Sequence, residues 1–308
     1  MSLSTSEMSS ALLALSNNLA DAVEQAGNAV VAVNARQRMS SSGVCWRPGV
    51  IVTADHTVKR EEEITVTLPD GRTVPATLAG RDTSTDLAVL KSEVDLPIAE
   101  IGDASLLKVG HMVLALGRSG EIGLSASLGV VSAKSGAWRT WRGGQIDQFL
   151  RLDLTLYPGS SGGPLVDASG RVVGINTSGL SRRMDLVIPA STVNRVVDQL
   201  LEKGHIARGY LGLGMQPVRL PDTLKNTLNL SEAGGVIVVN IEPNGPADQA
   251  GVLIGDVLVE FDGKPVSDTG DVQAILGSER VGKTISAHIV RGGLSVELAI
   301  AVGERPQS

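Results

Sequence analysis

Short apolar runs alternate with turn-forming residues over residues 43–188, and this pattern restricts the fold more than any other feature of the chain. Residues 64–68 alternate as a strand does, the Pro-Asp-Gly sequence at 69–71 supplies a turn, and residues 74–78 return as a second strand. Five further runs are typical of strands: 87–90, 113–116, 128–131, 149–154 and 172–175. Many strands with little helix between them predict a β-barrel or β-sandwich, and the 36 glycines suit its turns.

Two helices and a second β-rich region complete the predicted organisation. Residues 8–27 carry an apolar stripe at three- and four-residue steps, made of Leu12, Leu15, Leu19 and Val23. Residues 190–203 carry another, made of Val193, Val196, Val197, Leu200 and Leu201, and Gly204 follows as a stop signal. The second region has strands near 235–241, 257–261, 284–290 and 294–301, and a helix near 270–277. We therefore predict an N-terminal helical segment (1–28), a β-barrel domain (29–204) and a β-rich α/β domain (205–308).

Charge, hydropathy and cysteine content exclude several classes of protein. The net charge of −6 and the acidic pI provide no basic surface for nucleic acid or for anionic lipid. No stretch approaches the roughly 20 uncharged apolar residues of a membrane-spanning helix. Cys45 is the only cysteine, so no intrachain disulfide can form, and we expect a buried structural residue. The first ten residues lack the basic and apolar segments of a signal peptide, which leaves a cytoplasmic protein or a processed form open.

The strongest local signal is the sequence Gly-Ser-Ser-Gly-Gly-Pro at residues 159–164. Glycines around a serine permit a tight, strained turn and close approach of a substrate. Such a turn can direct the N–H groups of Gly159 and Ser161 at one point, where they would stabilise the negative oxygen of a tetrahedral intermediate. We include Ser160 in this predicted oxyanion hole. A plain surface turn is the alternative for this segment taken alone.

A serine nucleophile needs a base that removes its proton, and histidine is the usual one. The chain has four histidines. His56 ends an apolar run that finishes in small residues, whereas His111 lies in a loop, His205 in the linker and His288 in a strand of the second domain. His56 is therefore the predicted base.

The third member of such a site is a carboxylate that orients the imidazole. Asp86 stands at the mouth of the apolar run 87–90, and pairing with a histidine would explain a charge there. Asp55 is a rival that we rank lower, because adjacent strand residues point to opposite faces. The order His56, Asp86, Ser161 is that of chymotrypsin-like enzymes.

With these residues, the chain resembles the HtrA (Deg) family of serine proteases over residues 43–304. The matching segments are Thr53–Val58, Asp82–Lys91, Pro158–Val166, Gly174–Thr177 and Ile188–Ala190. The resemblance implies a mostly β fold: two six-stranded barrels of the chymotrypsin-like kind with the triad between them, followed by one PDZ domain. It also implies a homotrimer that uses no ATP, metal or other cofactor and cuts unfolded or damaged polypeptides in protein quality control.

The sequence departs from the family pattern beside the triad. The family usually has Asn-Asn before the histidine and Asn before the serine, whereas this chain has Ala54-Asp55 and Ser160. Both positions flank the chemistry, so we still expect activity. The stretch before His56 is short and lacks a long regulatory loop, which leaves any larger oligomer open.

Substrate preference is predicted from the residues before the nucleophile. Thr155 stands six residues before Ser161, where trypsin-like enzymes that cut after Lys or Arg carry an acid. We expect an uncharged specificity pocket formed by Thr155, Leu156 and Leu180 that prefers aliphatic side chains before the scissile bond.

Trp138 and Trp141 lie in the loop before this segment. In the family, the corresponding region helps to switch the oxyanion hole between ordered and disordered states. The tryptophans either anchor this loop or simply pack against the barrel.

In the C-terminal domain, residues 209–214 resemble the carboxylate-binding loop of the family's PDZ domains, and residues 245–256 match a second family segment. Exposed N–H groups in such a loop can bind a terminal carboxylate, and the peptide then adds as a strand beside a helix. The predicted peptide-binding residues are Tyr210, Leu211, Gly212, Leu213, Val272 and Leu276. Simple turn glycines are the alternative.

Three functions follow from these features. The first is an active endoprotease for unfolded polypeptides that also binds C-terminal peptides. The second is a proteolytically latent chaperone or peptide-binding protein. The third is an esterase that uses the same triad, but the PDZ-like domain argues against an esterase. The intact triad favours the first, and the resemblance implies a bacterial periplasm or cell envelope.

Overall fold

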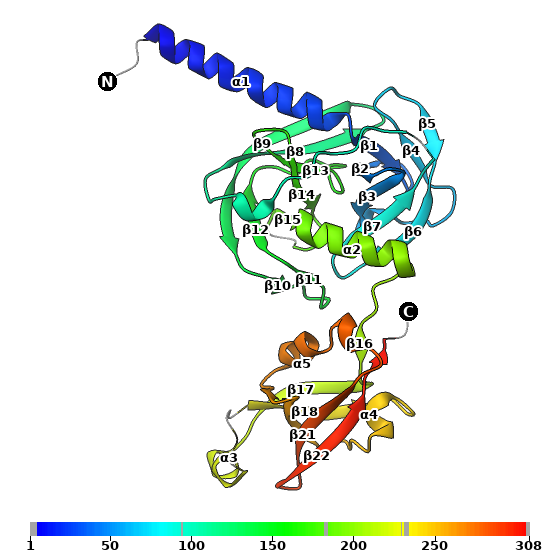
Figure 1. Cartoon of the computed structure of the whole chain (residues 1–308), viewed down its shortest axis with the longest axis vertical. Coiled ribbons are helices and arrows are strands. Elements are labelled where there is room, and N and C mark those ends of the chain that lie inside the picture. Colours follow the sequence, from blue (N-terminus) through cyan, green and yellow to red (C-terminus); the bar gives the residue numbers. More distant parts are fainter. Residues whose placement is uncertain (1–4, 94, 182–183, 229, 231–233, 306–308) are drawn as a thin grey trace. The chain divides into compact units, whose positions relative to one another are not determined.

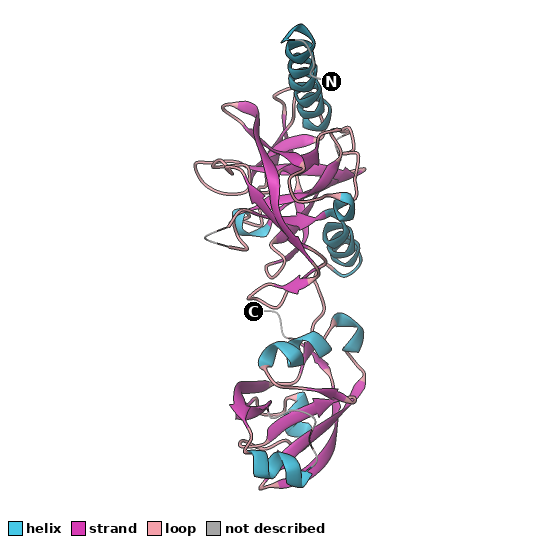
Figure 2. Ribbon diagram, turned by 90° about the vertical axis from the view of Figure 1, so that its left-hand side faces the viewer, coloured by secondary structure: helices cyan, strands magenta, loops and turns pink. Residues whose placement is uncertain are grey.

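The computed structural model describes residues 5–93, 95–181, 184–228, 230 and 234–305 (Figure 1). The chain divides into two compact units, Met1–Ile206 and Ala207–Ser308. Strands predominate in both, so the predicted fold class is confirmed (Figure 2). The finer division into residues 1–28, 29–204 and 205–308 stays a prediction.

Seven strands form the first antiparallel sheet of the N-terminal unit, in the order β5-β4-β1-β2-β3-β7-β6. Their bounds are β1 Val30–Asn34, β2 Ser41–Arg47, β3 Val50–Ala54, β4 Thr65–Thr67, β5 Thr73–Pro75, β6 Thr77–Asp82 and β7 Leu87–Lys91. The hairpin predicted over residues 64–78 is confirmed by β4 and β5, which pair with Val66 opposite Val74. This sheet has one strand more than the six that the resemblance implies.

Strands β3 and β7 are buried on both faces. Ile51 and Leu90 point into the core of the first sheet, whereas Val52 and Val89 point into a second cluster that this sheet shares with the rest of the unit. A strand that is covered on both sides has an unbroken apolar run in the sequence. Because both strands are fixed in this way, the residues that follow β3 and precede β7 have defined positions.

Six strands form a closed barrel in the order β12-β15-β14-β13-β8-β9. Their bounds are β8 Met112–Ser119, β9 Gly123–Ser135, β12 Phe149–Asp153, β13 Pro164–Asp167, β14 Val172–Thr177 and β15 Leu186–Pro189. The predicted runs 113–116, 128–131 and 172–175 are confirmed within these strands. Strand β9 is longer than predicted, because many of its residues are only partly buried and the apolar pattern is broken.

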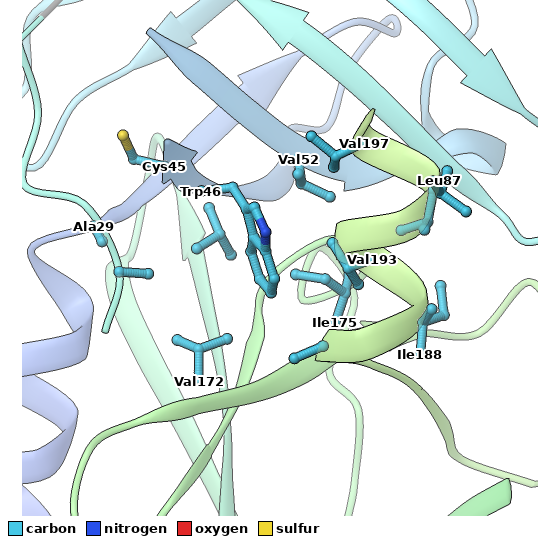
Figure 3. Close-up of a cluster of buried hydrophobic side chains, with 14 of the residues drawn as sticks. Ala29, Cys45, Trp46, Val52, Leu87, Val172, Ile175, Ile188, Val193 and Val197 are labelled. Atoms are coloured by element: carbon cyan, nitrogen blue, oxygen red, sulfur yellow. The ribbon is translucent and has the colours of Figure 1, made fainter. Parts of the chain in front are cut away.

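The two sheets pack on each other and on α2 (Ala190–Lys203) through one large apolar cluster (Figure 3). The Trp46 ring lies in this cluster near Val193 of the helix, and its Nε1 donates a hydrogen bond of 2.7 Å to Asn194 Oδ1. Gly204 ends the helix with a φ of 76°, and its N–H donates to Leu200 O. Helix α2 thus has the bounds that the sequence predicts.

Helix α1 (Thr5–Gly27) packs on the unit through its C-terminal half. Ala22 and Ala26 are buried there, and Leu19 and Val23 pack beside them. The predicted apolar stripe lies on this helix, but Leu12 and Leu15 in it are 65% and 39% exposed, because nothing described covers that part of the helix.

Cys45 is buried in β2, as predicted. Burial raises the pKa of its thiol, and the nearby Asp95 carboxylate raises it further. The residue is therefore a packing group in this fold.

The C-terminal unit is a β-rich α/β fold. A sheet of order β17-β18-β19-β21-β22 carries the additional strand β20 beside β19, and β16 pairs with β23. The strands are β16 Gly209–Tyr210, β17 Leu213–Arg219, β18 Gly234–Ile241, β19 Val257–Phe261, β20 Lys264–Pro265, β21 Thr284–Arg291, β22 Leu294–Ala301 and β23 Gly303–Glu304. The helices are α3 Asp222–Leu228, α4 Pro246–Gln249 and α5 Thr269–Ile275. The predicted strands of this region are confirmed, and α5 corresponds to the helix expected near 270–277.

Candidate active site

His56 lies where β3 ends against β7. Ala54, the last residue of β3, is paired with Leu87, and residues Asp55–Thr57 form one turn of 3-10 helix. The Thr57 hydroxyl donates to Ala54 O at 2.7 Å and closes this turn. The buried strand therefore holds the backbone, while the imidazole side chain stays 28% exposed.

Asp86 is presented by the loop before β7. The carboxylate of Asp82 accepts hydrogen bonds from Ser84 N–H, Ser84 Oγ and Thr85 Oγ1 at 3.2, 2.7 and 2.7 Å, which fixes the loop. Asp86 itself has a φ of 60°, in the left-handed region that aspartate tolerates better than most residues. This local conformation leads the chain directly from the loop into β7.

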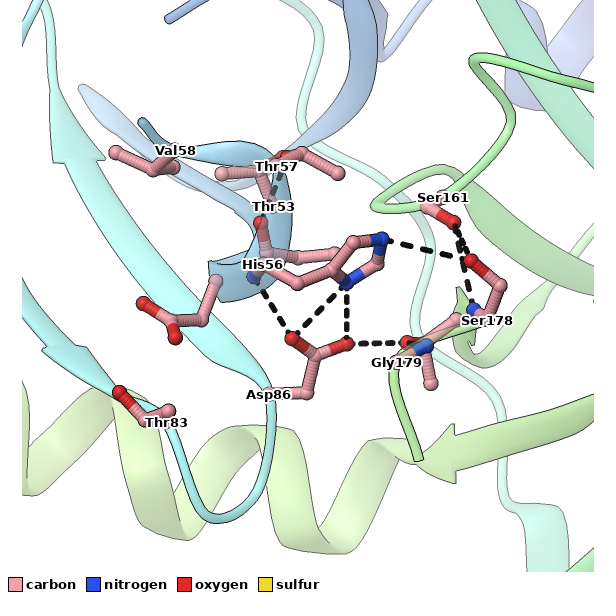
Figure 4. A network of polar contacts seen from close by, with 12 residues as sticks. Thr53, His56, Thr57, Val58, Thr83, Asp86, Ser161, Ser178 and Gly179 are labelled. Atoms are coloured by element: carbon pink, nitrogen blue, oxygen red, sulfur yellow. Dashed lines mark hydrogen bonds and ion pairs between the residues drawn. The ribbon is translucent and has the colours of Figure 1, made fainter. Parts of the chain in front are cut away.

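The Asp86 carboxylate orients the His56 ring (Figure 4). His56 Nδ1 lies 2.8 Å from Asp86 Oδ2 and 3.0 Å from Oδ1, and Oδ1 also accepts the His56 backbone N–H at 2.8 Å. A carboxylate accepts but does not donate, so Nδ1 carries the proton of the neutral ring. The lone pair on Nε2 is then available for a proton from another group.

Asp55, the rival acid, has a different partner. Its buried carboxylate forms an ion pair of 2.5 Å with Arg81 Nε, and Arg81 also donates to Val58 O. The ranking of Asp86 above Asp55 agrees with this geometry, but its reason was wrong, because residues 55–57 form a helical turn and not a strand.

Ser161 lies in the turn before β13, and glycines make this turn possible. Gly159 and Gly162 have φ values of 93° and 87°, in the left-handed region. A Cβ on Gly162 would lie 2.2 Å from Ser42 O, and one on Gly163 would lie 2.1 Å from Leu116 O. The turn can therefore approach the strands only with glycine at these positions.

Two of the three predicted oxyanion-hole residues have N–H groups available. In the described part of the chain, the N–H groups of Gly159 and Ser161 have no recorded acceptor, whereas Ser160 N–H donates to Tyr157 O at 3.0 Å. Including Ser160 as a donor was therefore wrong, because its N–H closes the turn. The Ser42 hydroxyl of β2 donates to Gly159 O at 2.7 Å and so anchors the turn that carries Ser161.

Three residues at and after the end of β14, Thr177, Ser178 and Gly179, complete the site, and we predicted a role for none of them. Thr177 Oγ1 donates to Asp86 Oδ2 and accepts the Gly179 N–H at 2.8 Å. Ser178 Oγ lies 3.2 Å from Ser161 Oγ and 3.5 Å from His56 Nε2. The segment Gly174–Thr177 already matched the family in the sequence, and this match was the one signal that pointed to the neighbourhood.

His56, Asp86 and Ser161 lie close together, but their hydrogen bonds do not run directly from Asp86 through His56 to Ser161. His56 and Asp86 are bonded directly, but among the described residues no hydrogen bond joins Ser161 Oγ to His56 Nε2. Ser178 stands between them (Figure 4). The arrangement brings a serine hydroxyl, an imidazole and a carboxylate around one point.

The predicted specificity-pocket residues do not share one apolar cluster. Leu180 is buried in the cluster between the sheets, Leu156 packs on the core of the closed barrel, and Thr155 is exposed. The three side chains do not line one common pocket in this structure, so the specificity pocket stays a prediction.

The two tryptophans lie on a small hairpin of β10 (Trp138–Arg139) and β11 (Gln145–Ile146). The Trp138 ring packs edge-on against Phe149 at 5.7 Å, whereas Trp141 is 74% exposed. Trp138 therefore packs against the barrel, the simpler of the two expectations.

The C-terminal peptide-binding residues have mixed environments. Val272 is completely buried and Leu211 is 3% exposed, so both belong to the core of the unit. Placing Val272 in an open groove was wrong, because the apolar face of α5 is covered by the sheet. Gly212 has a φ of 75°, Leu213 begins the edge strand β17, and Leu276 is only partly buried.

No helix in the described part of the chain is long and apolar enough to cross a membrane. Within the same residues, no group of three or more His, Cys, Asp or Glu side chains could hold a metal ion.

Comparison with known proteins places both units in known families. A trypsin-like peptidase domain matches residues 41–175, and a PDZ domain matches residues 209–302. Relatives from Halomonas elongata and Pseudomonas fulva, each named a probable periplasmic serine endoprotease DegP-like, are 34% and 35% identical over 279 and 276 residues. These alignments cover 89% and 88% of this chain but only 58% and 57% of the relatives, so the chain spans less than two thirds of their length.

Solved structures match over a larger share of their length. The HtrA-type protease AlgW with decapeptide has a TM-score of 0.76 and 30% identity, with 94% of this chain and 99% of the other covered. The serine endoprotease from Yersinia pestis has a TM-score of 0.76 and 30% identity, with 94% and 98% covered. With both domains matched in order and the fold shared, the chain belongs to the HtrA family of trypsin-like serine proteases that carry a PDZ domain.

Proposed function

We propose that the chain is a serine endopeptidase that cleaves unfolded or damaged polypeptides through an acyl-enzyme on Ser161. This proposal depends on the His56–Asp86 pair, in which His56 Nδ1 contacts both carboxylate oxygens of Asp86. The other ring nitrogen, Nε2, faces the side of the site where Ser161 lies (Figure 4). Of the three functions considered, a latent chaperone requires no such combination of a buried acid, an oriented imidazole and a serine in a glycine turn. An esterase would use the same groups, and the PDZ domain favours the peptidase over it.

In the first half of the reaction, Ser161 Oγ attacks the substrate carbonyl carbon while its proton passes to His56 Nε2. The Asp86 carboxylate stabilises the imidazolium that forms. The imidazolium then gives this proton to the leaving amine nitrogen, and the peptide C–N bond breaks. Water repeats the sequence on the acyl-enzyme and releases the new carboxyl end.

The N–H groups of Gly159 and Ser161 would bind the oxygen that becomes negative during both attacks. Two observations support this role. Among the described residues neither N–H group has an acceptor within the protein, and the Ser42 hydroxyl holds the Gly159 carbonyl in place. Each such donor is typically worth about 3–4 kcal/mol of transition-state stabilisation.

We propose that residues before the scissile bond are aliphatic. The position six residues before the nucleophile is Thr155, which offers no charge to a Lys or Arg side chain. Leu156 and Leu180 would supply the apolar surface of the specificity pocket, Leu156 from the core of the closed barrel and Leu180 from the cluster between the sheets.

The PDZ unit is proposed to bind the C-terminal ends of polypeptides. Strand β17 is at the edge of its sheet and can accept one more strand. Gly212, with its positive φ, precedes this strand and suits a loop that binds a carboxylate. A solved relative is described with a bound decapeptide, which supports this use of the fold.

A homotrimer in the bacterial periplasm or cell envelope completes the proposal. The family resemblance supports the trimer, and the names of the curated relatives support the compartment. Sedimentation velocity of the purified chain tests the first point, and fractionation of the native host tests the second.

Casein degradation tests the proposed activity. The wild-type chain should degrade casein without ATP, Ser161→Ala should lose all of this activity, and the mapped cleavage sites should follow aliphatic residues. Suppressed aggregation of an unfolded protein without any cleavage would instead identify a chaperone. Hydrolysis of a small ester without cleavage of casein would identify an esterase.

A further inference from the structure

The hydroxyl of Ser178 contacts both reacting atoms of the proposed protease. Ser178 Oγ lies 3.2 Å from the nucleophile Ser161 Oγ and 3.5 Å from His56 Nε2. The Ser178 N–H also points to Ser161 Oγ at 3.4 Å. The nucleophile thus has two contacts with residue 178 and none recorded with the base, within the described residues (Figure 4).

The backbone on both sides of Ser178 is fixed, so the position of its side chain is a property of the fold. Before it, Thr177 is bound through its hydroxyl to Asp86 Oδ2. After it, Gly179 N–H is bound back to the same hydroxyl at 2.8 Å. A Cβ on Gly179 would collide with the Asp86 carboxylate, which shows how closely this segment follows the His56–Asp86 pair.

The direction of the hydrogen bonds follows from the ring. His56 Nδ1–H is committed to Asp86, so Nε2 of the neutral ring can only accept. Ser178 O–H is then the donor to Nε2, and Ser178 Oγ accepts the proton of Ser161 O–H. The contacts of Ser178 Oγ, at 3.2 and 3.5 Å, are longer than the usual 2.7–2.8 Å of hydroxyl hydrogen bonds. Both hydrogen bonds are therefore weak and can be broken when a substrate binds.

We propose that Ser178 holds the nucleophile and the base apart in a resting arrangement, and that its hydroxyl must leave Nε2 before Ser161 can attack. This inference rests on the proposed peptidase function. In the attack itself, the Ser161 O–H bond breaks, its proton goes to His56 Nε2, and the Oγ–carbon bond forms. A Ser178 hydroxyl bound to Nε2 occupies the acceptor that this proton needs.

Removal of the Ser178 hydroxyl should increase the acylation rate constant by a modest factor. Net contributions of single neutral hydrogen bonds correspond to roughly a fivefold change in an equilibrium. Ser178→Ala should therefore increase the rate constant of acylation about fivefold, because the resting contact is lost and the attacking geometry is otherwise unchanged. Substrate binding does not involve this contact, so KM should change less than kcat.

The experiment measures acylation directly in the full-length chain. Second-order inactivation by a fluorophosphonate and kcat and KM for a chromogenic peptide are compared for wild type, Ser178→Ala and Ser178→Thr. Thr retains the hydroxyl and should stay within about twofold of wild type. Ser169→Ala, an exposed serine in the turn between β13 and β14, is the matched control and should equal wild type.

The outcomes separate this inference from the function on which it rests. A faster Ser178→Ala with an unchanged melting temperature supports the resting contact, since damage to the fold would not raise the rate. An unchanged or slower Ser178→Ala overturns it, and a loss of tenfold or more would make Ser178 a participant in proton transfer instead. If the wild type reacts with no phosphonate and cuts no peptide, the proposed function itself has failed.

Discussion

At the scale of single residues, the space around His56 and Asp86 admits no additional carbon atom at position 179. A Cβ on Gly179 would lie 2.4 Å from Asp86 Oδ2 and 2.7 Å from His56 Nδ1. Both distances are far below van der Waals contact, so the carboxylate or the ring must move. The requirement for glycine at this position comes from the His56–Asp86 pair and not from backbone conformation.

Gly179→Ala should therefore lower kcat/KM for a peptide substrate by about 100-fold, the size of effect that a misplacement near 1 Å produces. Gly136→Ala is the control, because a Cβ there meets nothing within 4 Å. Steady-state kinetics and thermal unfolding of both variants are the measurements. Full activity in Gly179→Ala would show that the pair does not need the geometry described above.

The sequence predicted Asp86, His56 and Ser161 as members of one site because each stands at an end of a recognisable apolar run or in a glycine turn. Thr177 and Ser178 could not be found in this way. Their contacts join residues 91 and 122 positions apart in the chain, and only the packed sheets bring them together. Ser160 was wrongly included as a donor for a similar reason, since the acceptor of its N–H depends on the turn that the loop adopts.

At the scale of secondary-structure elements, the β10–β11 hairpin packs on the loop that presents Asp86. The Thr140 hydroxyl donates to Ser84 O at 2.7 Å and accepts Gly144 N–H at 3.0 Å. Arg142 donates to Thr83 O at 3.2 Å. The hairpin thus supports the loop between β6 and β7 from a segment 56 residues further along the chain.

Thr140→Val should remove this support while keeping the shape of the buried side chain. We expect kcat to fall about fivefold, the equivalent of one hydrogen bond, because Asp86 is held less firmly. Gln145→Ala, on the same hairpin and exposed, should leave kcat unchanged. Equal kinetics for Thr140→Val and wild type would remove the hairpin from the account of the site.

Elements were predicted best where one apolar pattern repeats without interruption. Helix α2 has its predicted bounds because its apolar face is continuous and Gly204 ends it. The apolar stripe of α1 did not tell that Leu12 is exposed, because a pattern gives a face but not the partner that covers it. Val272 was assigned to a groove for the same reason, although the sheet covers it completely.

At the scale of the whole molecule, each unit has its own core and its own buried charge. In the PDZ unit, Asp256 is 1% exposed and forms a double ion pair with Arg291, with distances of 2.8 and 2.7 Å. Burial acts to raise the pKa of Asp256, but the hydrogen bonds from Arg291 and from Leu253 N–H outweigh it, so the pKa is lowered. An acid with a lowered pKa stabilises the folded unit above about pH 4, and this contribution is lost as the pH falls below that value.

Asp256→Asn should therefore lower the free energy of unfolding of the PDZ unit by about 2 kcal/mol at pH 7. The difference from wild type should shrink as the pH falls from about 5 to 3, because the wild-type carboxyl is then protonated as well. Calorimetry of the full-length chain over this range is the measurement. A difference that stays constant with pH would mean that the ion pair is not the source of the acid sensitivity.

We propose that Ser161 is a nucleophile whose proton is taken by His56, and mass spectrometry after treatment with a fluorophosphonate tests this most directly, in wild type and in His56→Ala. We expect one adduct, located on Ser161 in the wild type and strongly reduced in His56→Ala. Labelling of Ser161 at the same rate in both proteins, or an adduct on another residue only, would contradict it.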